Sequence, residues 1–199
     1  MSKTPRAKKP IIATTFSGVF VSDRAFKEAH KIGMKELADK AKMPEIYEAE
    51  QSPDYFQKVE KALEKVYPNL SPKERIVKRR AIYFVRVLDL MKKEDIDTDM
   101  INYFGHLKKK YRIALITTIS SKAIDKFLEF TGLLDFFDII VTTEPDEKDD
   151  KRLVWERFIK QHGKPHLYVG DSKRDFEICS KKGIEFLTVI EFRECAQEI

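Results

Sequence analysis

The chain has 199 residues, of which 36% are charged and 42% hydrophobic, and its formal net charge is +5. That length can bury a core in one domain, or in one domain that carries an insertion. The two cysteines form no CxxC pair, the first ten residues lack the apolar segment of a signal peptide, and no apolar run approaches the roughly 18 residues of a membrane span. We therefore expect a soluble, cytoplasmic protein with no membrane partner.

The N-terminal part of the chain predicts a tail and one strand. Residues 1–10 are basic and polar, and we expect them to be disordered. The apolar run Ile11 to Phe16 predicts a strand that ends at Ser17 and Gly18, because a glycine there marks a turn. Val19 to Val21 continues it as a short extended piece.

Helical patterns occupy residues 22 to 97. Apolar residues recur at helical spacing from Phe26 to Ala41, and again after Ser52 and Pro53 as far as Tyr67. The third helix has the clearest start, with Ser71 as N-cap, Pro72 in the first turn and Glu74 completing a capping box, and it runs to about Met91. Three amphipathic helices with short connections predict a small inserted helical domain.

From residue 98 strands and helices alternate. The expected elements are a helix over Met100 to Lys109, a strand over Arg112 to Thr117, a helix from Ser120 or Ser121 to Thr131, a strand over Ile139 to Thr142, a helix over Arg152 to Gln161, a strand over Leu167 to Val169, and then a short helix and a last strand. This alternation predicts an α/β fold, a Rossmann-like three-layer parallel sheet covered by helices on both faces.

In such sheets the site lies beyond the carboxyl ends of the strands. Hydroxyl, ammonium and carboxylate groups that converge there can bind a phosphate and a magnesium ion together. Asp171 and Asp175, around the first turn of the short helix that follows Val169, serve as magnesium ligands or simply as helix caps; both interpretations stay open. Nothing at the strand ends is an obvious nucleophile or base. The residues expected there are Thr14, Thr15, Ser17, Gly18, Thr117, Thr118, Ser120, Lys148, Lys151, Asp171 and Asp175.

The segments IALITT, VTTE followed by a lysine, and YVGDSKRDFEICSKKGI, in this order, resemble the haloacid dehalogenase (HAD) superfamily, most of whose members are magnesium-dependent phosphohydrolases. The resemblance implies strand order 3-2-1-4-5, a core of residues 11–21 and 98–199, and a helical cap over 22–97. It also implies that Thr117, with Thr118, binds phosphate, that Lys148 is the pocket lysine with Lys151 as second choice, and that Asp171 and Asp175 hold magnesium.

The first family motif departs from this pattern. Family members resemble one another here as DxDGT or DxDGV, whose first aspartate attacks the substrate and whose second acts as acid and base. This chain has TFSGVF, so Thr15 and Ser17 stand in place of both carboxylates. A threonine hydroxyl is not ionised at pH 7 and needs a neighbouring base, and none is visible in this strand. The missing carboxylate also weakens any magnesium site.

The leading functional hypothesis is a HAD-like protein that has lost phosphohydrolase activity and binds a small phosphorylated ligand or a protein partner. The alternative is a magnesium-dependent phosphatase that acts on a small phosphorylated metabolite and uses Asp171, Asp175 or a cap residue such as Asp23 in an unusual way. The basic run around Lys73 to Arg80 could face nucleic acid, but acids are interleaved almost everywhere. We interpret that run as a solvated helix face and expect no nucleic-acid partner.

Overall fold

The computed structural model describes residues 9–48 and 54–197. The predictions for the tail, apart from Lys9 and Pro10, and for a helix start at Ser52 and Pro53 fall outside the described residues. None of the described helices is long and apolar enough to cross a membrane.

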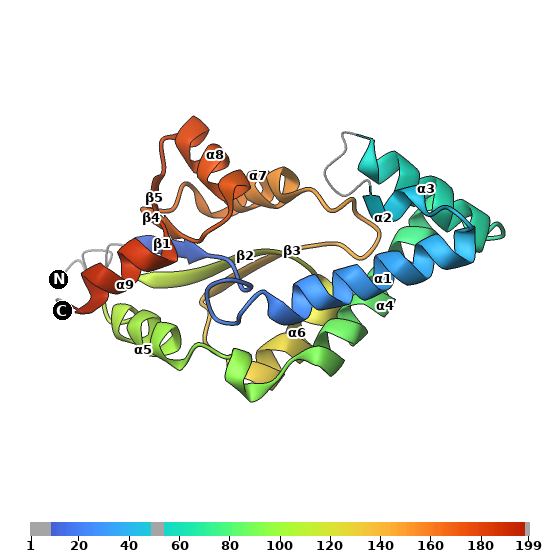
Figure 1. Ribbon diagram of the computed structural model, residues 1–199. Coiled ribbons are helices and arrows are strands. Elements are labelled where there is room, and N and C mark those ends of the chain that lie inside the picture. The colour runs from blue at the N-terminus through green and yellow to red at the C-terminus, as the bar shows by residue number, and fades with distance from the viewer. Residues whose placement is uncertain (1–8, 49–53, 198–199) are drawn as a thin grey trace, which may run out of the picture.

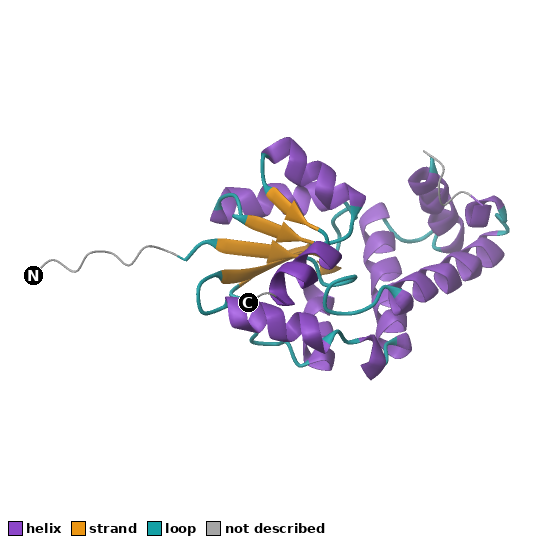
Figure 2. Cartoon of the chain, turned by 60° about the vertical axis from the view of Figure 1, so that its left-hand side comes forward, coloured by secondary structure: helices purple, strands orange, loops and turns teal. Residues whose placement is uncertain are grey.

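A five-stranded parallel sheet forms the centre of the fold, with strand order β3-β2-β1-β4-β5 (Figure 2). This order and the α/β class confirm the prediction. Each strand pairs in parallel with its neighbour, as Thr14 of β1 does with Leu115 of β2 and Val169 of β4. All the carboxyl ends therefore meet at one edge. The strands are β1 (Ile11–Thr14), β2 (Arg112–Ser120), β3 (Ile139–Thr143), β4 (Leu167–Val169) and β5 (Glu185–Leu187).

Helices cover both faces of the sheet. Helices α7 (Lys151–His162) and α8 (Lys173–Lys182) pack on one face through Trp155, Phe158 and Cys179, and Tyr168 of β4 belongs to the same cluster. Helices α5 (Thr98–Leu107), α6 (Ser121–Thr131) and α9 (Val189–Gln197) pack on the other face. Strands buried on both sides explain why residues 11–13 of β1 and 113–116 of β2 are continuous apolar runs rather than alternating patterns.

The inserted segment folds into helices that extend to one side of the sheet (Figure 1). They are α1 (Arg24–Ala41), α2 (Glu45–Glu48), α3 (Tyr55–Val66) and α4 (Pro72–Leu90), followed by the 3-10 turn η1 (Lys93–Asp95). Leu37, Ile46, Val59 and Leu63 belong to a small core of their own. The three predicted helices are present, and the structure adds α2 and η1. The predicted capping box at Ser71 is also confirmed.

The helices of the insertion are not separate from the main core. Ala25 and Ala29 of α1 and Phe84 and Val87 of α4 belong to the same buried cluster as β1 and β2. For that reason the expected division at residues 22 and 97 stays a prediction.

Asp95 joins the two chain segments that connect the sheet to the insertion. Its carboxylate accepts hydrogen bonds from Arg24 Nε (2.9 Å), from Ser22 Oγ (2.7 Å) and from the Lys92 backbone N–H (2.8 Å). Next to it, the Asp97 N–H donates to the Phe20 carbonyl at 2.8 Å. The entry and exit of the insertion are therefore held side by side.

Candidate functional site

The carboxyl ends of β1, β2 and β4 bring together side chains that lie far apart in the sequence. Thr15 follows β1 directly and is half-buried. Its Oγ1 lies 3.2 Å from Lys151 Nζ, at the first position of α7. The same ammonium donates to the Ile116 carbonyl of β2 at 2.8 Å. The hydroxyl at the position of the family's nucleophile thus has an amine as its neighbour, although the sequence showed no base for it.

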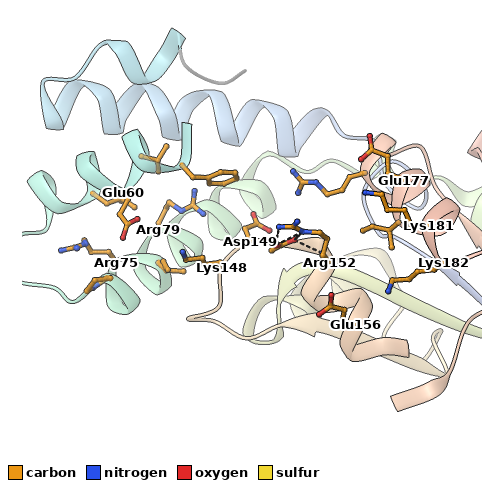
Figure 3. Close-up of a pocket in the computed structure, with 18 residues that line it drawn as sticks. Glu60, Arg75, Arg79, Lys148, Asp149, Arg152, Glu156, Glu177, Lys181 and Lys182 are labelled. Carbon is orange, nitrogen blue, oxygen red and sulfur yellow. Dashed lines mark hydrogen bonds and ion pairs between the residues drawn. The ribbon is translucent and has the colours of Figure 1, made fainter. Parts of the chain in front are cut away.

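Lys151, the second choice from the sequence, is the lysine that the structure brings to Thr15. Its side chain is buried, with the whole residue 7% exposed. Lys148, the first choice, is exposed on the loop before α7 and lines a cleft between α3, α4, α7 and α8 (Figure 3). Burial lowers the pKa of Lys151 from its usual value, and the charge of Asp175 opposes this shift.

Asp175 is the most deeply buried carboxylate at these strand ends, at 1% exposed. Its Oδ2 lies 3.5 Å from Lys151 Nζ, and its Oδ1 accepts a hydrogen bond from Trp155 Nε1 at 2.9 Å. Burial raises the pKa of the nearby Cys179 thiol to about 12, with Asp175 adding to the shift. Burial and the charge of Asp175 also raise the pKa of Tyr168 well above its usual value. Asp175 therefore holds Lys151 within a largely apolar environment.

Asp171 takes a different position. It is exposed, and its Oδ1 accepts a hydrogen bond from the Val189 N–H at the start of α9, at 3.0 Å. The N-cap of α8 is Ser172, whose side chain accepts from the Asp175 N–H at 3.4 Å. Asp171 therefore does not cap α8 but contacts the start of α9, and its predicted role as a magnesium ligand stays a prediction.

The second substituted position, Ser17, also has a carboxylate partner. Ser17 Oγ donates a hydrogen bond to Asp23 Oδ1, just before the first turn of α1. Gly18 lies between them in the left-handed region at φ 80°, and a side chain there would meet the Asp23 carboxylate oxygen at 3.6 Å. A carboxylate from the insertion thus stands beside the position where the family has its acid and base.

The threonines at the end of β2 contact the protein itself. Thr117 is buried, and its Oγ1 accepts from the Ile119 N–H at 3.2 Å. The Thr118 carbonyl accepts from Arg80 Nη2 at 2.6 Å. The predicted phosphate-binding role of these threonines therefore stays a prediction, and of the two Thr118 has the less buried side chain.

Arg80 is a buried structural residue, whereas the sequence predicted a place for it on a solvated basic helix face. It is 4% exposed, and it also donates to the carbonyls of Glu144 (3.0 Å) and Glu147 (2.9 Å) and to Thr143 Oγ1. Burial lowers its pKa. Arg80 ties α4 to the ends of β2 and β3. The helical period could have predicted this burial, because Arg80 lies four residues after Ile76 and four before Phe84 and therefore on the apolar face of the helix.

The described residues do not fit a magnesium ion of the kind the family uses. Magnesium prefers several oxygen ligands, usually with one or two carboxylates. Here β1 offers hydroxyls, Asp171 accepts from a backbone N–H, and both oxygens of Asp175 contact Trp155 or Lys151. No group of three or more His, Cys, Asp or Glu residues in the described chain is arranged to hold a metal ion.

The comparisons with known proteins agree with this architecture. The family model for haloacid dehalogenase-like hydrolases matches residues 27–189, which leaves β1 and the substituted first motif outside the match. No curated protein sequence matches the chain.

Several solved structures share the fold. A haloacid dehalogenase-like family hydrolase from Streptococcus pneumoniae has 19% identity and a TM-score of 0.58 over 90% of this chain and 84% of that one. A protein described as a predicted phosphatase from Clostridium acetobutylicum has 13% identity and a TM-score of 0.53 over 97% and 100%. The HAD-hydrolase described as YfnB from Bacillus subtilis, solved bound to magnesium, has 14% identity and a TM-score of 0.51 over 90% and 88%. With a family match over more than half of its length and the expected sheet order, this chain belongs to the haloacid dehalogenase-like hydrolase family.

Proposed function

We propose that this protein hydrolyses phosphate monoesters of small molecules, with Thr15 in the place of the family's aspartate nucleophile. The contact between Thr15 Oγ1 and Lys151 Nζ carries the proposal. A hydroxyl becomes a useful nucleophile when a base beside it accepts its proton and a third group orients that base. Lys151 lies beside the Thr15 hydroxyl in the position of the base, and Asp175 lies beside Lys151 in the position of the orienting group. The family and the phosphatases among its structural neighbours favour the same reaction class.

The reaction has two steps. In the first, Thr15 Oγ1 bonds to phosphorus while the ester P–O bond breaks; the hydroxyl proton passes to Lys151 in the fraction of molecules whose amine is neutral, a fraction that burial increases by lowering the pKa of Lys151, and the leaving alkoxide takes a proton from solvent. In the second, water displaces Thr15 from phosphorus, which restores the hydroxyl and releases inorganic phosphate, and Lys151 returns its proton to solvent. Asp175 stabilises the ammonium between the steps because it lies 3.5 Å from Nζ.

The experiment compares native protein with Thr15→Val and Thr15→Ser on p-nitrophenyl phosphate and a panel of sugar phosphates. Valine keeps the shape of threonine and removes the hydroxyl, whereas serine keeps the hydroxyl. We expect turnover by the native protein and by Thr15→Ser, and a loss that approaches the roughly millionfold cost of removing a nucleophile in Thr15→Val. Trapped protein should carry a phosphoryl group on Thr15, detected by mass spectrometry. Equal turnover by native protein and Thr15→Val would refute this role.

A second candidate function is binding without turnover, in which the protein holds a phosphorylated ligand or a protein partner. The observation that favours it is the first motif itself, where neither Thr15 nor Ser17 supplies the carboxylate that the family uses. The double variant Thr15→Asp, Ser17→Asp distinguishes the two candidates. Under this second candidate the native protein is inactive, and the double variant gains magnesium-dependent turnover because it restores both carboxylates of the first motif.

A further inference from the structure

A cleft of about 740 Å³ lies between the inserted helices and the helices that cover the sheet. Its walls come from α3 and α4 on one side and from α7, α8 and the loop before α7 on the other. Neither Thr15 nor Asp171 lines it, so it is distinct from the strand-end site. A volume of this size accommodates a small molecule.

The two walls of the cleft differ in chemistry. The wall from the inserted helices is largely apolar, and Phe56 on it is 58% exposed. The opposite wall carries most of the charge. Around the middle, Arg79 of α4, Lys148 of the loop and Arg152 of α7 come from three different segments (Figure 3). An apolar wall that faces cations suits a molecule with an apolar body and an anionic end.

Most cations of the cleft form no ion pair with the residues that the structure describes. Seven of its lining residues are basic and five are acidic. Of the basic ones, only Arg152 forms an ion pair within the described part of the chain, with Asp150 at 2.7 Å. Arg75 is buried and pairs with no described carboxylate; its Nη1 donates to the Leu70 carbonyl at 2.7 Å, and its Nε has no described acceptor. A buried cation without an anion is costly, and an anionic ligand in the cleft would offset that cost.

We propose that this cleft binds a phosphorylated molecule with a flat, ring-containing body, of which a nucleoside monophosphate is the simplest example. Arg79 and Lys148 bind the phosphate, because guanidinium and ammonium groups form strong charge-assisted hydrogen bonds to phosphate oxygens. The ring stacks on Phe56, since aromatic side chains stack on bases of any identity. The site does not depend on turnover at Thr15, so the two proposals stand separately.

Isothermal titration with AMP, adenosine and ribose 5-phosphate tests this site on the full-length native protein and on full-length Thr15→Val, which lacks the proposed nucleophile and therefore does not hydrolyse the two phosphate esters during the titration. We expect AMP to bind at least tenfold more tightly than either fragment, because it alone uses both walls. Arg79→Ala should weaken AMP binding about tenfold or more, as loss of a hydrogen bond to a charged group does. Phe56→Ala should weaken AMP about tenfold and leave ribose 5-phosphate unchanged.

Two controls keep the test specific. Lys73 lies on α4, is exposed, pairs with Asp146 at 3.2 Å and does not line the cleft, so Lys73→Ala should bind AMP like the native protein. Thr15→Val should also bind AMP normally, which separates this site from the strand ends even if no turnover is found. Absence of AMP binding at millimolar concentration, or equal binding by Arg79→Ala and native protein, would overturn the proposal. Loss of binding in Thr15→Val would move the ligand to the strand ends and overturn it as well.

Discussion

The buried pair of Lys151 and Asp175 gives the sharpest prediction. Both side chains are withdrawn from water, at 9% and 2% exposed, and their charged atoms lie 3.5 Å apart. Removal of one partner leaves the other charge buried and uncompensated, which typically costs about 3–5 kcal/mol. We therefore expect Lys151→Met to lower the free energy of unfolding by about 3–5 kcal/mol at pH 7. Methionine is chosen because it keeps the length of the side chain and removes only the charge and the hydrogen bonds.

The matching change is Asp175→Asn. Asparagine keeps an oxygen for the Trp155 indole N–H, so this variant loses the charge but not that hydrogen bond. It leaves Lys151 buried with only Thr15 and the Ile116 carbonyl as partners. In the double variant no buried charge remains. The double variant should therefore lose less stability than the two single variants lose together. We expect the difference, which is the coupling energy of the pair, to be about 2 kcal/mol, as is usual for residues in contact.

Urea unfolding followed by circular dichroism measures all four proteins of this cycle, and an unchanged slope against urea shows that each unfolds as the native protein does. Additive losses, with no coupling between the two sites, would refute the reasoning, because they would mean that the two charges do not stabilise each other.

A pH series on Asp175→Asn gives a second check on the same pair. Burial lowers the pKa of Lys151, and Asp175 opposes that shift, so the variant has the lower pKa. Between the folded and the unfolded pKa of a lysine the unfolded chain binds more protons, so stability rises with pH. The deficit of Asp175→Asn should therefore shrink over the range in which the pH rises from the folded pKa of Lys151 in the variant to its folded pKa in the native protein, and stay constant above that range. A deficit that stays constant over this range would contradict the account.

Three further predictions concern the rest of the molecule. Arg80→Met should lower the free energy of unfolding by about 3 kcal/mol and speed amide hydrogen exchange over residues 144–150, because several oxygens lose their donor. Hydrogen bonds from Arg24, Ser22 and Lys92 hold the pKa of Asp95 far below its usual value. Its stabilisation is therefore present above about pH 4 and lost gradually as the pH falls from there toward the folded pKa, so Asp95→Asn should lose about 2 kcal/mol at pH 7 and progressively less below about pH 4 in acid unfolding. Finally, a thiol reagent at pH 8 should modify Cys195, which is exposed, and spare Cys179, whose pKa burial raises to about 12.

The fold was accessible from the sequence because its signals are local. Continuous apolar runs predicted strands buried on both faces, and glycines ended helices where the structure has left-handed caps, as at Gly132 and Gly183. The capping box at Ser71 was equally clear. The strand order came from the resemblance to the family, since apolar runs alone do not say which strands are neighbours.

The contacts of the site were less accessible, because they depend on where side chains point. Lys148 and Lys151 are separated by three positions, and only the helix that begins at Lys151 turns one of them inward. Asp23 reaches Ser17 because the chain reverses at Gly18. The separation of the two residues in the sequence does not predict that their side chains meet. The absence of a base near Thr15 was inferred within one strand, whereas Lys151 comes from an element more than a hundred residues away.

These contacts bear on how a ligand would reach the strand ends. The magnesium-bound structure of YfnB from Bacillus subtilis is described as revealing interdomain movement in that protein. In this chain a rotation of the inserted helices as a unit would pull Arg80 from its acceptors on β2, β3 and the following loop, and Phe84 and Val87 from the main core. Such a motion exposes buried apolar surface and leaves a buried cation without partners, and both are costly. We therefore expect the inserted helices to stay in place when a small ligand binds at the strand ends.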